Sequence, residues 1–204
     1  MREFIEINDF YPDILVSENY IVYKQILTED HLELCHDNVG ELYKDKVKIG
    51  KEYLFLLHQN LQKTMMSNHE SETITNQKFI DYALGDVLIF GLGLGLIIFP
   101  LLKDKHINRI VVVEVDEGLI EIISPIILKH DIYSKVEIIN GDAFNWVTDE
   151  KFDTIYFDIW HTIDGKSFKE MNELSEKFIS NLKPDGWMDS WCSELIKNKN
   201  YESK

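Results

Sequence analysis

The sequence contains few of the residues that hold small domains together covalently or through a metal. Its two cysteines, Cys35 and Cys192, lie far apart in a chain of 204 residues, which excludes a disulfide framework and indicates reduced thiols, as in a cytoplasmic protein. His31 and Cys35 share one face of an expected helix, but no second pair of ligands accompanies them. We therefore predict no metal site. A hydrophobic content of 45%, with 12% aromatic residues, is enough to form a core at this length.

The sequence also has no hydrophobic run of membrane-spanning length. The longest one, residues 87–102, is interrupted by three glycines and Pro100, whereas a transmembrane helix needs about 20 apolar residues. The first residues lack the basic flank and apolar centre of a signal peptide. We expect a cytoplasmic protein without a membrane partner.

Basic residues are scarce. There are 21 Lys and Arg residues against 36 Asp and Glu residues, which gives a net charge of −15. Nucleic-acid binding needs concentrated positive charge, and the sequence has no basic stripe interleaved with aromatics. We predict no nucleic-acid partner, and the acidic surface favours the approach of cations.

Glycines are few as well, yet three of them fall at alternate positions after an apolar strand. The strand 87–90 leads into Gly91, Gly93 and Gly95, and the next apolar strand, 110–113, ends at Glu114. Residues without Cβ let a chain pass close to a ligand, and a carboxylate at the end of the second strand suits a ribose diol. The dinucleotide pattern G-x-G-x-x-G would need its third glycine one position later.

Three later segments follow in an order that makes chance agreement improbable: residues 140–144 (NGDAF), residues 152–158 (FDTIYFD) and residues 182–187 (LKPDGW). Together with the glycine segment, they resemble the class I S-adenosylmethionine-dependent methyltransferase superfamily, from Gly85 to about Leu195. The resemblance implies S-adenosylmethionine as the cofactor. It also implies a cofactor site made of Gly91, Leu92, Gly93, Gly95, Glu114, Val115, Asp142, Ala143 and Asp158.

Within that superfamily, the chain is most similar to the spermidine synthase-like branch. The segment 113–116 (VEVD) resembles the second-strand motif of that branch. Two positions depart from it, because the branch usually has aspartate where this chain has Leu94 and where it has His161. Both departures weigh against aminopropyl transfer.

The resemblance implies a doubly wound, Rossmann-like α/β domain over residues 83–204, with a mainly parallel sheet in the strand order 3-2-1-4-5. Residues 1–82 are expected to form an extension with a helix over about 17–43 and a β-hairpin over 52–66. The loop 67–73 would then lie near the reactive end of the cofactor.

The remaining elements follow from the residue pattern. Apolar spacing predicts a helix over 164–182, and Pro100 and Pro125 should shorten, kink or restart the two earlier helices. The fifth strand is expected at 186–191, with a helix over 193–199. The usual two further strands are not expected, so a sheet edge would be left open, and a homodimer is one way to cover it.

We predict methyl transfer to a small or medium-sized acceptor, for which a cation is one candidate. Asp158 would orient the reacting groups, His161 would act as a base, and Trp160, Glu72 and Met66 would contact the acceptor. Purely structural roles stay open: a capping Asp158, a packed Trp160 and a surface His161. Two other functions also stay open, namely a spermidine synthase-like aminopropyltransferase and a non-catalytic nucleoside-binding protein.

Overall fold

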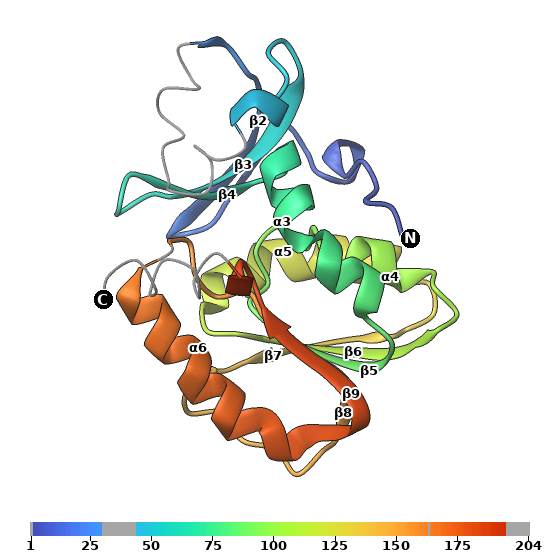
Figure 1. Ribbon diagram of the computed structural model, residues 1–204. Coiled ribbons are helices and arrows are strands. Elements are labelled where there is room, and N and C mark those ends of the chain that lie inside the picture. Colours follow the sequence, from blue (N-terminus) through green and yellow to red (C-terminus); the bar gives the residue numbers. More distant parts are fainter. Residues whose placement is uncertain (1, 30–43, 163, 195–204) are drawn as a thin grey trace.

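The computed structural model describes residues 2–29, 44–162 and 164–194, which form two sheets (Figure 1). The first is antiparallel, in the order β1-β2-β3-β4. The second is parallel, in the order β7-β6-β5-β8-β9. The strands are β1 (Ile14–Val16), β2 (Tyr20–Ile26), β3 (Glu52–His58), β4 (Lys63–Ser67), β5 (Gly85–Phe90), β6 (Ile107–Glu114), β7 (Val136–Asn140), β8 (Phe152–Phe157) and β9 (Leu182–Ser190).

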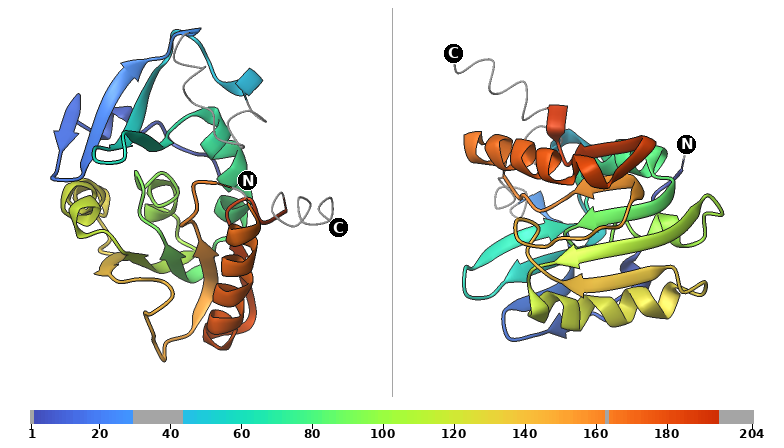
Figure 2. Two further views of the ribbon diagram at one scale, coloured as in Figure 1. Left: turned by 90° about the vertical axis from the view of Figure 1, so that its left-hand side faces the viewer. Right: turned by 90° about the horizontal axis from the view of Figure 1, so that it is seen from below.

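The parallel sheet has the order 3-2-1-4-5 when its strands are numbered along the chain, so the Rossmann-like prediction is confirmed. Helices cover both of its faces (Figure 2). They are α3 (Glu70–Tyr82), α4 (Phe99–Leu102), α5 (Glu117–His130) and α6 (Gly165–Phe178). Short 3-10 turns occupy Asn8–Phe10, Lys44–Lys46 and Ile179–Asn181.

Alternation along β5 explains how the sheet is buried on both sides. Val87 and Ile89 belong to one core cluster, which includes residues of α3, α4 and α5. Leu88 and Phe90 belong to a second cluster, which includes residues of α6. Successive side chains of a strand point to opposite faces, so a continuous apolar run is what a strand covered on both faces requires.

The predicted hairpin is confirmed as β3 and β4, but the helix predicted over about 17–43 is wrong where the chain is described. Residues 20–26 form β2, which pairs with β3 along its whole length. Aromatic and β-branched residues such as Tyr20 and Val22 favour a strand, and both are buried. Residues 30–43 lie outside the described residues, as do His31 and Cys35 of the metal prediction.

The loop predicted over 67–73 is also wrong, because α3 begins at Glu70. Glu70 and Glu72 lie in the first turn, where carboxylates are favourable beside the positive end of the helix dipole. Glu72 of this helix lines the cavity described below, and its place near the reactive end of the cofactor stays a prediction.

The two prolines act differently. Pro100 lies in the first turn of α4, which has four residues and is short as predicted. Pro125 lies inside α5, which nevertheless runs over 14 residues. Pro125 is on the exposed side of α5, where water can satisfy the backbone carbonyl that a proline leaves without a partner. The prediction of a short or restarted helix is therefore wrong for α5.

The carboxyl-terminal elements are shifted relative to their predicted bounds. α6 ends at Phe178 rather than at residue 182. β9 begins at Leu182, four residues before the predicted start, and its pairing with β8 is irregular between Phe152 and Thr154. The helix predicted over 193–199 lies mostly outside the described residues.

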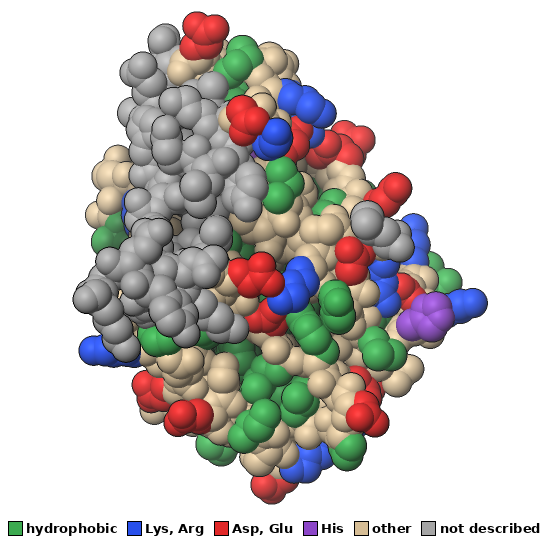
Figure 3. Space-filling model, viewed as in Figure 1, with side chains coloured by type: hydrophobic (Ala, Val, Ile, Leu, Met, Phe, Trp, Pro, Cys, Tyr) green, Lys and Arg blue, Asp and Glu red, His purple; other side chains and the backbone are tan. Residues whose placement is uncertain are grey.

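β9 forms one edge of the parallel sheet among the described residues. Figure 3 shows apolar side chains gathered over this strand in the lower half of the view. Nearby, Tyr82 and Leu84 are exposed, and the Tyr82 ring stacks on Trp187 at 5.5 Å. The homodimer and the division of the chain at residue 82 stay predictions. No helix of the described residues combines the length and apolar character needed to cross a bilayer.

Candidate active site

A cavity of about 410 Å³ lies at the carboxyl ends of β5, β6 and β8, and the antiparallel sheet closes it from the other side. This is the end of a parallel sheet at which ligands bind, next to the point where the strand order reverses. Of the residues predicted from the sequence, all but Gly95 line it: Met66, Glu72, Gly91, Leu92, Gly93, Glu114, Val115, Asp142, Ala143, Asp158, Trp160 and His161.

Glu114, at the end of β6, is held rigidly in the cavity wall. Its Oε2 accepts the Leu92 amide at 2.8 Å and its Oε1 accepts the Asp116 amide at 2.9 Å. Burial raises the pKa of the carboxyl, and these backbone bonds oppose that rise. Each carboxylate oxygen can accept a further hydrogen bond, so the side chain is preorganised for a diol.

The turn that contains Gly91, Gly93 and Gly95, called the glycine turn below, is shaped by contacts within the protein. Gly91 has a φ of +100°, and a Cβ placed on it would overlap the carbonyl oxygen of Asp158. Gly95, which does not line the cavity, faces Ile127 and Phe99. Gly95 is therefore a structural residue of the turn rather than part of the cavity wall.

Gly93 faces the cavity, but the nearest group is Met66. A Cβ on Gly93 would overlap the Met66 sulfur, and the φ of Gly93 is +48°. A larger residue at this position would therefore displace the protein's own methionine before it met a ligand.

Asp158 follows β8 directly and is the most perturbed acid of the cavity. Among the described residues, none donates a hydrogen bond to its carboxylate or forms an ion pair with it. Burial raises the pKa of this carboxyl from 3.8 to about 7. An acid with this pKa is partly protonated at neutral pH, so it can exchange a proton with a bound group or pair with a cation. The capping role is not observed for this carboxylate.

Trp160 and His161 continue the same loop. The indole nitrogen of Trp160 donates to Glu170 Oε2 on α6 at 2.8 Å, which fixes the ring in the cavity wall. His161 is exposed at the cavity mouth. Both packing and ligand contact are thus compatible with Trp160.

Asp142 caps the turn after β7. Its Oδ1 accepts the Phe144 amide at 3.0 Å, and its Oδ2 accepts the Asn145 side-chain amide at 2.5 Å. Ala143 is buried beside it, and Val115 is largely exposed. These three residues line the cavity after the carboxyl ends of β6 and β7.

Several lining residues could not be identified from the sequence. Tyr20 reaches the cavity from β2, and its hydroxyl donates to Asp116 at 3.1 Å. Trp191 follows β9, and its indole donates to Thr75 at 3.1 Å. Met65 and Leu56 come from the hairpin. The hairpin was itself predicted from its pattern, whereas nothing in the local sequence of Tyr20 or Trp191 indicates a site.

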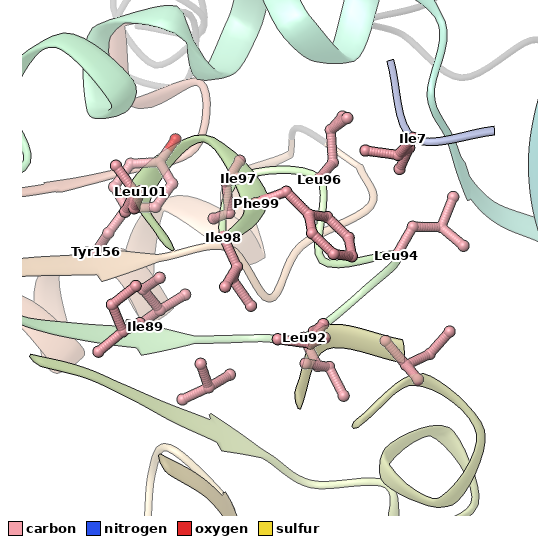
Figure 4. Close-up of a cluster of buried hydrophobic side chains, with 14 of the residues drawn as sticks. Ile7, Ile89, Leu92, Leu94, Leu96, Ile97, Ile98, Phe99, Leu101 and Tyr156 are labelled. Atoms are coloured by element: carbon pink, nitrogen blue, oxygen red, sulfur yellow. The ribbon is translucent and has the colours of Figure 1, made fainter. Parts of the chain in front are cut away.

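The charge of the described lining is of one sign. Five of these residues are acidic and none is Lys or Arg: Glu72, Glu114, Asp116, Asp142 and Asp158. Leu94, where the related branch usually has aspartate, is fully buried. Figure 4 shows it among the apolar side chains of the core, in the same cluster as Ile7 and Phe99.

Residues 57–197 match the family model of the spermine/spermidine synthase domain. The chain belongs to this family. The resemblance to the spermidine synthase-like branch is thereby confirmed. No curated protein matches the chain.

Solved structures with a similar fold include DhpI in complex with S-adenosylhomocysteine (20% identity, TM-score 0.44, covering 59% of this chain and 56% of that one). The N-methyltransferase NodS from Bradyrhizobium japonicum WM9, also with S-adenosylhomocysteine, has 18% identity and a TM-score of 0.46, with coverages of 59% and 60%. The glycopeptide N-methyltransferase MtfA with sinefungin has 17% identity and a TM-score of 0.44, with coverages of 57% and 46%. The chain thus spans about half of the length of these structures, and at this identity the likeness concerns the fold alone.

Proposed function

We propose that this protein is an S-adenosylmethionine-dependent methyltransferase that acts on a small or medium-sized acceptor. One observation carries the proposal: Glu114 and Asp158 flank the glycine turn in one cavity at the switch point of the sheet. Glu114 is anchored by backbone amides, and the desolvated carboxylate of Asp158 has no partner among the described residues. The Glu114 carboxylate is suited to accept hydrogen bonds from a ribose diol, and the Asp158 carboxylate is suited to pair with a cationic group.

The residues present fit the adenosyl cofactor. Glu114 would accept the ribose hydroxyls, Asp142 would accept the adenine amino group, and Asp158 would lie near the charged tail. The cofactor supplies an activated methyl group on a sulfonium. The protein then needs to align an acceptor with that methyl group and to exclude water.

Asp158 would orient the reacting groups and take up a proton where the acceptor carries one. His161, at the mouth, would pass the proton to solvent or act as the base itself. Trp160, Met66 and Glu72 would contact the acceptor.

Methyl transfer is favoured over aminopropyl transfer because of two positions. The side chain of Leu94 lies in the core and supplies no carboxylate to the cavity, and His161 replaces the second expected acid. A diamine would therefore lose two of the carboxylates that hold it in the related branch.

Aminopropyl transfer is nevertheless the second candidate, because the described lining still holds five acidic residues and no basic one. Such a lining favours a polycation and a cofactor without a carboxylate. A nucleoside-binding protein without catalysis is the third reading.

Calorimetry with S-adenosylmethionine, its decarboxylated form, S-adenosylhomocysteine and NAD tests the proposal. Glu114→Gln should weaken S-adenosylhomocysteine binding about tenfold, because a hydrogen bond to a charged acceptor contributes about 1.5–3 kcal/mol. Glutamine keeps one oxygen acceptor for the backbone, so the fold should survive. Glu117→Gln, an exposed change three residues away and outside the cavity, is the matched control.

Tighter binding of NAD than of S-adenosylmethionine, its decarboxylated form and S-adenosylhomocysteine would overturn the cofactor assignment. Formation of spermidine from putrescine and the decarboxylated cofactor would promote the second candidate, and binding without any turnover would promote the third. The cytoplasmic location and a homodimer stay predictions from the sequence.

A further inference from the structure

The hairpin places an unusual group on the glycine turn. The Leu94 amide donates to the sulfur of Met66 at 3.1 Å, and the same sulfur occupies the space directly above Gly93. Met66 belongs to β4, which is separated from the turn by 28 residues of sequence. A side chain of the antiparallel sheet thus occupies the surface of the turn that glycines leave open.

A β-bulge produces this arrangement. The register between β3 and β4 shifts between Leu56 and Leu57, so that Leu56 pairs with Met66 and Leu57 with Thr64. Met65 is the extra residue. Consecutive side chains of a regular strand point to opposite faces, whereas Met65 and Met66 both line the cavity. A bulge that redirects a side chain next to a site is a recurrent device.

The backbone carbonyl of Leu94, unlike its amide, is bonded to a residue of the protein interior. This carbonyl accepts the Tyr11 hydroxyl at 2.6 Å, and Tyr11 is 3% exposed. Met66 is half-buried and faces the cavity. The tyrosine contact therefore lies in the interior, while Met66 itself lines the cavity, so a ligand reaches the Leu94 amide only when Met66 moves aside.

A thioether is a weak hydrogen-bond acceptor, and an amide donates more strongly to oxygen. Met66 satisfies the Leu94 amide without a ligand and yields it readily to a carboxylate or carbonyl oxygen. We propose that Met66 is a displaceable stand-in for the ligand's amino-acid tail on the glycine turn, and that it sets the affinity for ligands that carry this tail. The inference rests on the proposed adenosyl site.

The test compares two ligands that differ in the tail. S-adenosylhomocysteine carries the amino-acid tail, whereas 5′-methylthioadenosine has the same nucleoside and sulfur without it. Met66→Ala should tighten S-adenosylhomocysteine binding by about threefold to tenfold, which is the size of one weak hydrogen bond, and should leave methylthioadenosine within about twofold. Met65→Ala removes a neighbouring methionine from the same wall and should not separate the two ligands.

A ligand-independent measurement accompanies the calorimetry. Hydrogen exchange of the Leu94 amide should be faster in Met66→Ala than in the wild type. The Leu92 amide, which is bonded to Glu114, should be unchanged and reports whether the turn itself has kept its structure.

The outcomes separate this inference from the proposed function. Binding of both ligands with equal changes, or weaker S-adenosylhomocysteine binding in Met66→Ala, would overturn the role of Met66 and leave the proposed function intact. Absence of binding by the wild type and by Met66→Ala would overturn both. Binding by Met66→Ala alone would support the stand-in role in its strongest form.

Discussion

Replacement of Asp158 by asparagine should stabilise the protein at neutral and alkaline pH while it weakens ligand binding. The pKa of Asp158 is about 7 in the native protein and 3.8 as its ordinary value. Since the native pKa is the higher one, the native state holds the proton more tightly than the unfolded chain does. The stabilisation from this group is complete below pH 3.8 and is lost as the pH rises through about 7.

The size of this loss of stability follows from the difference of about three units between the native and the ordinary pKa of Asp158. That difference corresponds to at most about 4 kcal/mol. Asp158 lines a cavity that water enters, so screening reduces the figure, and we expect about 2 kcal/mol. That is a considerable share of a total stability of about 5–15 kcal/mol. Asparagine has no proton to lose, so the variant should escape this loss.

Urea denaturation at pH 5, 6, 7 and 8 measures the effect. The free energy of unfolding of Asp158→Asn minus that of the wild type should increase by about 1.2 kcal/mol from pH 5 to pH 8, because only about two of the three pK units lie above pH 5. Asp149→Asn, at an exposed carboxylate, controls for the change in net charge. Parallel pH profiles for Asp158→Asn and the wild type would refute the desolvation argument, and with it the reason for assigning Asp158 to the reacting groups.

Two further predictions concern buried positions. His69 is buried, and burial lowers its pKa from 6.5 to about 4, so stability present above pH 6.5 is lost as the pH falls through 4, by up to about 3 kcal/mol. Urea denaturation at pH 4.5 and 7 should show a smaller acid loss for His69→Phe than for the wild type, and equal losses would contradict this. Leu94→Asp places a carboxylate in the core and should cost about 4 kcal/mol or more, seen as a lower Tm or as insoluble protein. A folded Leu94→Asp variant that produces spermidine would instead reopen aminopropyl transfer.

The parallel sheet could be predicted because each of its signals is local. The apolar strand 87–90, the glycines after it and the acid at the end of the next strand lie within 30 residues of sequence. The strand order 3-2-1-4-5 is what the family resemblance carried by these segments implies. The sequence predicts the place of Asp158 for the same reason, since an acid that directly follows a parallel strand must lie at the carboxyl edge of the sheet.

The other wall of the cavity could not be predicted in this way. The hydrogen bond from Tyr20 to Asp116 joins residues 96 apart, and the one from Trp191 to Thr75 joins residues 116 apart. Neither side chain has a local pattern that indicates a ligand. The segment that contains Tyr20 is predicted as a helix, because its polar and apolar residues fit a helical period as well as a strand period. Pairing with β3 makes it a strand.

The glycines of the turn are required by contacts within the protein as well as by any space for a ligand. The spacing of Gly91, Gly93 and Gly95 suggests room for a ligand, yet Gly91 makes way for the carbonyl of Asp158 and Gly95 for Ile127. Gly91 and Gly93 both line the cavity, but only at Gly93 is the space of the missing Cβ on the side of the antiparallel sheet, and there Met66 occupies it. The ligand-binding meaning of the motif therefore depends on one glycine and on a methionine that the chain brings from another sheet. A sequence with the same glycines and no such hairpin would present an open turn, so our proposal attributes the ligand selectivity of this site to the pairing of Gly93 with Met66.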